Sequence, residues 1–320
     1  PSCREKYRQP IGNYIVGNNG VRIDAEKAGD ISVIANNGNN VIHGVNDAVY
    51  NSGSGTITIQ AGFSSDTGIS LLDDFVGYNN VLTAGANGVH SDGTGTTNVI
   101  ADNDNIIAGT TNGILSNDSG TINVTAGNNN IIGQYKDESG NTVTSENGIN
   151  VTAGTVNITT ENGTNKIFAG AHGILTDGNN AVAKLLGNTH EILVTGDQDA
   201  VDTDGAIGIY TKNNSSVIAP ETQVYENFTI NVTGADVQDA KGTATGIRLN
   251  TNSNISLYGK NLNIYTNGLS ANGIEAYENS SVNLNNTGTV YIESIGKKAS
   301  HGIRVQNSTL DLNAKSLTII

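Results

Sequence analysis

The sequence predicts an all-β fold, a right-handed, three-sided parallel β-helix of about ten coils. Three observations lead to this prediction. They are an unusual composition, a short sequence motif (the phrase) that recurs along the chain, and short stretches between its copies in which apolar and polar residues alternate. Of 320 residues, 47 are Asn, 40 are Gly and 34 are Thr. All three rank low in helix propensity. Asn and Gly favour turns, whereas Thr, Val and Ile favour strands.

The recurring phrase is a small residue followed by Ile or Val, often with Asn before it. The shortest steps between copies are 25 residues, and we interpret the longer steps as this unit with insertions. A fixed period of this size is the signature of a solenoid. The apolar positions are Val21, Val49, Val89, Ile114, Ile149, Ile174, Ile209, Ile247, Ile274 and Ile303.

Each unit contains three short strands separated by Gly and Asn turns. The second strand alternates apolar and polar residues, as in Thr121-Ile122-Asn123-Val124-Thr125, which is typical of a half-buried strand. One such strand cannot bury its apolar side alone, but stacked coils can. Parallel crossovers are strongly right-handed. At ~4.8 Å per coil, ten coils extend roughly 50 Å.

Stacking predicts columns of apolar side chains. The recurring Ile and Val positions form the first column. We expect the Gly or Ala before each of them to lie at a corner where a tight turn needs a positive φ. We expect Asn at corners to bond to backbone and stack into ladders. The second column is predicted as Ile31, Ile57, Val99, Ile122, Val156, Ile255, Val282 and Leu310.

The alternative fold is a β-sandwich or barrel in which two-residue hairpins join neighbouring strands.

Composition excludes several classes of function. The net charge is −14 and basic residues are scattered, which disfavours nucleic acid as a partner. Cys3 has no partner for a disulfide, and one Cys with five scattered His does not suggest zinc. No apolar run is long enough to cross a membrane. We predict no cofactor.

The phrase at Asn112-Gly113-Ile114 and Gly120 to Gly127, with its repeats, resembles the passenger domain of a bacterial autotransporter adhesin. The resemblance is one of residue pattern and repeat period, and it extends from about Tyr14 to Ile320. It implies a protein exported through the outer membrane to the bacterial cell surface. There it would mediate adhesion, self-association or biofilm formation with a host surface protein, a glycan or the same protein on another cell. Residues 1–13 are expected to be a leader of the fragment, and 14–320 one β-helix domain that continues beyond it.

Catalytic motifs are weak, so we predict that the chain is not an enzyme. The string most similar to a serine protease motif, Asn117-Asp118-Ser119-Gly120, lacks the first Gly. A polysaccharide-degrading β-helix enzyme, either a lyase or a hydrolase, is the main alternative. Such enzymes use acidic clusters on a strand face, and no Asp pair falls on a predicted strand. A stalk without binding function is a third possibility.

The insertions supply the candidate binding residues. Three of them, at 133–147, 196–206 and 234–245, follow the third strand, so stacking places them on one edge of the solenoid. Loops on a rigid scaffold commonly bind partners. The run from 197 to 204 also offers oxygen ligands for Ca²⁺ at Asp197, Asp199, Asp202 and Asp204, although a solvated acidic loop is the stronger interpretation. The adhesive-edge candidates are Tyr135, Asp137, Glu138, Glu146, Asp197, Asp199, Asp202, Asp204, Asp236 and Asp239.

Two further expectations concern other surfaces. The insertion from 62 to 78 follows a second strand, lies on another edge, and has apolar residues suited to packing over a face. Residues after the column positions point outward, so Arg248, Glu275 and Arg304 should stack as a ladder of alternating charge. Surface stabilisation is its expected role, with ligand binding the weaker alternative.

Overall fold

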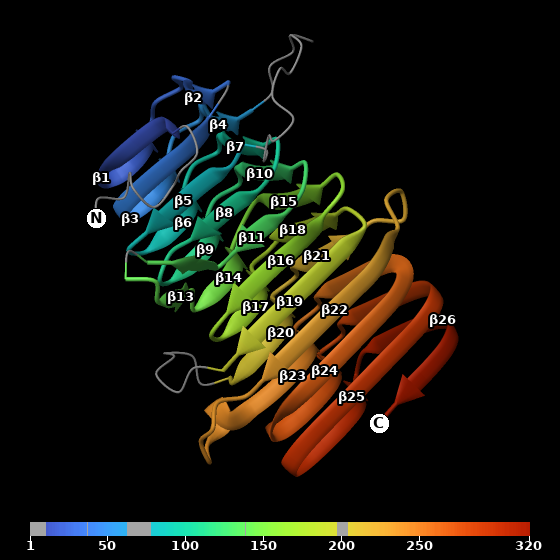
Figure 1. Cartoon of the computed structure of the whole chain (residues 1–320). Coiled ribbons are helices and arrows are strands. Elements are labelled where there is room, and N and C mark those ends of the chain that lie inside the picture. The colour runs from blue at the N-terminus through green and yellow to red at the C-terminus, as the bar shows by residue number, and fades with distance from the viewer. Residues whose placement is uncertain (1–10, 37, 63–77, 138, 197–203) are drawn as a thin grey trace, which may run out of the picture.

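The chain folds as a parallel β-helix in which coils stack along one axis, with β1 and β26 at opposite ends (Figure 1). The computed structural model describes residues 11–36, 38–62, 78–137, 139–196 and 204–320. One sheet of 24 strands contains all but two of the described strands. Its pairs are parallel, and the antiparallel pair in the described chain is the small hairpin β12–β13. The predicted fold class is confirmed, and the sandwich or barrel alternative is wrong.

Three faces repeat along the stack, and the long strands continue around corners from one face to the next. The first face holds the ends of β1 (Ile11–Ile23) and β3 (Asn39–Asn51), then β6 (Asn87–Ser91), β9 (Asn112–Ser116), β14 (Asn147–Val151), β17 (His172–Asp177), β20 (Ala206–Lys212), β23 (Thr243–Leu249) and the ends of β24 (Asn254–Tyr277) and β25 (Ser281–Gln306). The predicted boundary between residues 13 and 14 falls inside β1.

The second and third faces follow in chain order within each coil. The second face holds β2 (Ile31–Ala35), β4 (Thr56–Ala61), β7 (Thr96–Ala101), β10 (Thr121–Ala126), β15 (Thr155–Thr160), β18 (Val182–Leu186), β21 (Ser216–Ala219) and the starts of β24, β25 and β26 (Thr309–Ile319). The third face holds the starts of β1 and β3, then β5 (Asn80–Ala84), β8 (Asn105–Ala108), β11 (Asn130–Ile132), β16 (Thr164–Ala169), β19 (Thr189–Thr195), β22 (Tyr225–Thr233) and later parts of β24, β25 and β26.

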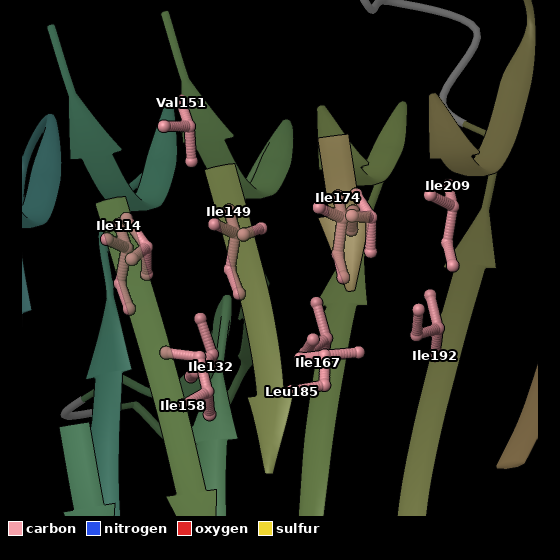
Figure 2. Packing of buried hydrophobic residues seen from close by; sticks show 14 of the residues in the cluster. Ile114, Ile132, Ile149, Val151, Ile158, Ile167, Ile174, Leu185, Ile192 and Ile209 are labelled. Carbon is pink, nitrogen blue, oxygen red and sulfur yellow. The ribbon is translucent and has the colours of Figure 1, made fainter. Parts of the chain in front are cut away.

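The predicted first column is confirmed at all ten positions. Each member pairs in register with the equivalent residue of the next coil, from Val21 with Val49 to Ile274 with Ile303. Figure 2 shows Ile114, Ile149, Ile174 and Ile209 following one another along the stack, near third-face residues such as Ile132 and Ile192. Most of the column is fully buried. Burial of an Ile side chain contributes about 1.5–3 kcal/mol, so these columns are the main source of stability.

The predicted second column is wrong at Val99. Ile57 and Ile122 both pair with Thr97, whose side chain is fully buried in the row. Val99 belongs two residues further along, between Ile59 and Val124. Both rows point inward, because alternate residues of a strand share one face. Ala183 and Val217 complete the second column.

The expectation for corner glycines was right about position and wrong about cause. The glycines before the first-column residues do not have a positive φ. They are needed for space instead: a Cβ on Gly173 would lie 2.3 Å from Cγ2 of Ile192 and 2.6 Å from the carbonyl oxygen of Gly208. Where the third-face residue is Ile, the first and third faces approach each other too closely at this corner for a side chain.

Asparagine fills a buried row at the corner between the second and third faces, which we call the inner ladder. Each Nδ2 before Asn165 donates to Oδ1 of the next coil over 2.8–2.9 Å and also donates to a backbone carbonyl. The members from Asn40 onward are fully buried, so the amide groups satisfy one another where water is absent. The inner ladder consists of Asn13, Asn40, Asn80, Asn105, Asn130 and Asn165.

A second buried row of amides, the edge ladder, follows the corner between the third and first faces. Its hydrogen bonds run the opposite way along the stack. His172 Nδ1 donates to Asn147, Asn147 to Asn112, Asn112 to Asn87, and Asn87 to the carboxylate of Asp47, over 2.7–3.1 Å. The row therefore ends on a group that only accepts hydrogen bonds. The predicted Asn ladders exist at both corners.

His190 ends the inner ladder. Its Nδ1 accepts the amide of Asn165 at 3.1 Å, so the proton of the neutral ring resides on Nε2. The ring packs edge-on against Tyr225 and Phe228, with centroids 6.0 and 5.2 Å away. Burial lowers the pKa of His190 to about 4, because the charged form would lose its hydration. Beyond His190 the same row becomes apolar, with Phe228, Leu262 and Val290.

Acidification should therefore weaken the fold. The unfolded chain takes up a proton at His190 near pH 6.5, whereas the folded chain resists until about pH 4. The stability that the neutral His190 ring contributes is fully present above the pKa of the unfolded chain. It is lost as the pH falls from that pKa to the pKa of the folded chain, by about 2 kcal/mol between pH 7 and pH 5. Urea unfolding followed by circular dichroism at both pH values measures the loss. His190→Phe should reduce the pH dependence by this amount, and His43→Asn on the exposed surface should leave it intact. An undiminished dependence in His190→Phe would refute the assignment.

Candidate functional site: the loop edge

Three long insertions join the third face to the first, and we call the corner between these two faces the loop edge. In coils without an insertion, four residues separate the third-face Ile from the first residue of the edge row, as between Ile107 and Asn112. Fourteen residues separate Ile132 from Asn147, Ile192 from Ile207, and Ile230 from Thr245. Asn147, Ile207 and Thr245 belong to one row, so the loops share one edge, as predicted.

The first loop is a short antiparallel hairpin of β12 (Gln134–Lys136) and β13 (Thr142–Thr144). Asp137 closes its turn by accepting the backbone N–H of Asn141 at 2.8 Å and its side-chain amide at 3.0 Å. The side-chain hydrogen bond from Asn141 lowers the pKa of Asp137. Burial, and then the negative charge of Asp137, raise the pKa of Tyr135, whose side chain is half-buried. Asp137 is thus ionised and Tyr135 neutral near pH 7.

Glu146 lies at the base of this hairpin. Its backbone N–H donates to Thr110 of the preceding coil, and its carbonyl accepts Ala171 of the following coil at 2.8 Å. The half-buried side chain therefore has a fixed backbone position between three coils. Glu138 lies outside the described residues.

The third loop continues the edge toward the last coils. It contains the short 3-10 helix η1 (Ala240–Gly242) and carries Asp236 and Asp239, both exposed. Asp236 forms an ion pair of 3.3 Å with Lys297, which is two coils further along. This surface pair adds little stability, but it shows that side chains on the loop edge reach between coils.

The acidic run of the second loop is described only at its end. Asp197, Asp199 and Asp202 lie outside the described residues, and Asp204 is half-buried. Calcium binding by these residues stays a prediction. Elsewhere in the described ranges, no group of three or more His, Cys, Asp or Glu side chains is arranged to hold a metal ion. The apolar insertion at 63–77 also lies outside the described residues.

A compact charged cluster on the first face has no local signal in the sequence. His90 lies 3.4 Å from Asp47 and 3.0 Å from Asp92, and Tyr50 donates its hydroxyl to Asp92 at 3.1 Å. Burial disfavours the charged ring, but the hydrogen bond and charge of Asp47, and the charge of Asp92, raise the pKa of His90 overall. Asn117 donates to Asp92 at 2.9 Å. The hydrogen bond from Asn117 and the charge of His90 outweigh burial and lower the pKa of Asp92. The cluster assembles from three coils, which no local motif reveals.

The predicted charge ladder forms in part. Arg248, Glu275 and Arg304 stack in register, and Arg248 lies 3.6 Å from Glu275. Arg304 instead lies over the ring of Tyr277, 5.5 Å from its centroid. Tyr277 donates its hydroxyl to Glu275 at 2.7 Å, and burial, followed by that hydrogen bond, raises the pKa of Tyr277 to about 12. The tyrosine therefore takes the place of the second ion pair.

Comparison of the chain with family models, curated proteins and solved structures found no match. Within the described ranges, the structure contains no helix long and apolar enough to cross a membrane.

Proposed function

We propose that the protein is a bacterial cell-surface adhesin whose loop edge binds its partner. The observation that carries the proposal is the placement of the three loops: each has ten residues more than an uninserted corner, and all three occur at one corner of a regular scaffold. A solenoid buries its core without these residues. Long loops on a rigid scaffold are well suited to binding.

The charge of the loop edge indicates the kind of partner. Nine of the chain's thirty carboxylates belong to its candidate residues, including Asp137, Glu146, Asp236 and Asp239. Complementary charge speeds association and selects partners. A cationic patch on a host surface protein, or on a neighbouring cell, therefore fits the loop edge best. The resemblance to autotransporter passengers supports export to the cell surface.

Shortening all three loops tests this function. The uninserted corners supply the template, so deletion of 134–143, 195–204 and 233–242 leaves four residues at each corner. We expect cells displaying the triple deletion to lose adhesion to epithelial monolayers and to one another, with the β-sheet circular dichroism spectrum and thermal unfolding of the purified chain preserved. A second variant that neutralises Asp137, Asp236 and Asp239 as Asn should weaken adhesion at low salt most strongly.

Light scattering of the purified chain over a concentration series separates the two modes of adhesion. Growth of the particles with concentration indicates self-association, and its absence with retained host binding indicates a host ligand. Full adhesion by a correctly folded triple deletion would show that the loop edge is not the binding surface.

Polysaccharide cleavage is the second candidate function. The cluster of Asp47, His90, Asp92 and Tyr50 favours it, because carboxylates beside a histidine can supply an acid and a base. Release of reducing ends from polysaccharide by the purified chain, abolished in His90→Ala, would establish this activity in place of simple adhesion.

A further inference from the structure

Arginine has an uneven distribution in this acidic protein. In the described ranges, Arg22, Arg248 and Arg304 are the arginines, and all three occupy one outward row of the first face. Each guanidinium lies over a tyrosine ring: Arg22 over Tyr50 at 5.2 Å, Arg248 over Tyr210 at 5.6 Å, and Arg304 over Tyr277 at 5.5 Å. The first face therefore combines aromatic rings with fixed hydrogen-bond donors.

A groove of about 270 Å³ opens at the end of this row, where the first face turns toward the second. Three consecutive coils line it, two residues each: Arg248, Asn250, Tyr277, Glu278, Gln306 and Asn307. Glu278 and Asn307 have φ values of 57° and 51°, so tight left-handed turns hold the rim. The groove is on a different corner from the loop edge.

Two buried polar atoms from the residues that line the groove lack hydrogen-bond partners. Nε of Arg248 is a donor without an acceptor, since the carboxylate of Glu275 stays 3.6 Å away. Oδ1 of Asn250 is an acceptor without a donor, while the nitrogen of this amide donates to the hydroxyl of Tyr210 at 3.1 Å. Buried unpaired groups are rare in folded proteins and destabilise them. Both atoms are closed to solvent, so a bound molecule that both donates and accepts would satisfy the pair once the side chains of Arg248 and Asn250 turn toward the groove.

The chemistry of the lining specifies the ligand further. A hydroxyl group is the common ligand group that donates one hydrogen bond and accepts another, and vicinal hydroxyls match an arginine beside an amide. Tyr277 offers a ring against which an apolar sugar face can pack. Glu275 and Glu278 balance the charge of Arg248 and Arg304, which favours a neutral ligand. We propose that this groove binds a neutral saccharide, independently of the function of the loop edge.

An array of defined neutral and acidic oligosaccharides, followed by calorimetry with the strongest ligand, tests the proposal. We expect neutral oligosaccharides to bind the purified chain. Asn250→Leu removes the unpaired acceptor and should weaken binding by about tenfold. Gln306→Ala with Asn307→Gly changes only the exposed rim, keeps the left-handed turn, and should also weaken binding. Thr152→Ala, on the same face several coils away, is the matched control and should bind as the wild type does.

Three results would overturn the proposal. The first is that no oligosaccharide on the array binds. The second is binding confined to acidic saccharides, which would refute the neutral chemistry. The third is neutral binding that the rim variant leaves unchanged, which would place the saccharide elsewhere. If Asn250→Leu fails to fold, the rim variant still decides between these outcomes.

Discussion

Gly173→Ala is expected to lower the free energy of unfolding by about 3 kcal/mol or more, the upper range for overpacking a core. The added methyl group would lie 2.3 Å from Cγ2 of Ile192 and 2.6 Å from the carbonyl oxygen of Gly208. Contacts this short do not persist, so either the strand or the coil above must shift. Because stacked coils share one hydrogen-bond register, a shift at one corner disturbs both neighbours.

The chain itself indicates how this cost can be relieved. Gly20, Gly148 and the other corner glycines each face Cγ2 of the third-face Ile in their own coil. The exception is Ala48, which is fully buried, and in its coil the third-face residue of that row is Leu82. Leucine carries no methyl group on Cβ, which leaves room for the alanine. We therefore expect Ile192→Leu to recover much of the stability lost in Gly173→Ala.

Urea unfolding of both single variants and the double variant measures this coupling as a double-mutant cycle. Gly29→Ala is the control, since a Cβ there meets no atom within 4 Å and its φ is not positive. It should be neutral or slightly stabilising. Independent, additive effects of the two substitutions would show that the close contact with Ile192 is not the cause.

Asn130→Ala is expected to cost about 4 kcal/mol, because several buried groups lose their partners at once. Asn105 would lose the acceptor for its amide, at 2.9 Å, and Asn165 would lose its donor, at 2.8 Å. The carbonyl of Thr159 would also lose its hydrogen bond. None of these sites is open to water, since Asn105, Asn130 and Asn165 are fully buried.

An outward row of amides provides the matched control. Asn123 also donates to one asparagine, Asn98, and accepts from another, Asn157, at 2.9 and 2.8 Å, but it is half-exposed. Water can replace its partners, so Asn123→Ala should cost less than about 1 kcal/mol. Urea unfolding of both variants gives the comparison, and native-state hydrogen exchange locates the weakened coils. Equal losses in the two variants would mean that burial of the inner ladder is unimportant.

The sequence was sufficient to predict the parts of the structure that depend on period. The first column and the shared edge of the three loops both follow from counting residues between copies of the phrase. The second column failed at Val99 because Thr97 and Val99 both point inward, and hydrophobicity favours the wrong one of the two. Ala183 was missed because its small side chain gives a weak hydrophobic signal.

Contacts between residues of different coils could not be predicted from the sequence alone. His90 and Asp47 are 43 residues apart, and their contact requires the insertion at 62–78 to be discounted. The groove at Arg248 needs the turn conformations of three coils. Histidine positions near similar corners were visible in the sequence, but only the hydrogen bonds show why: His172 and His190 take the place of asparagine in the two ladders.

The opposite directions of the two ladders have an electrostatic consequence. A row of amides joined N–H to O=C is a row of aligned dipoles, with its positive end where the last N–H points. In the edge ladder that end meets the carboxylate of Asp47, and in the inner ladder it meets the ring of His190. A negative charge is favoured at the first position, and a protonated ring is disfavoured at the second, in addition to the effect of burial. Because the rows point in opposite senses, their dipoles largely cancel along the axis of the solenoid.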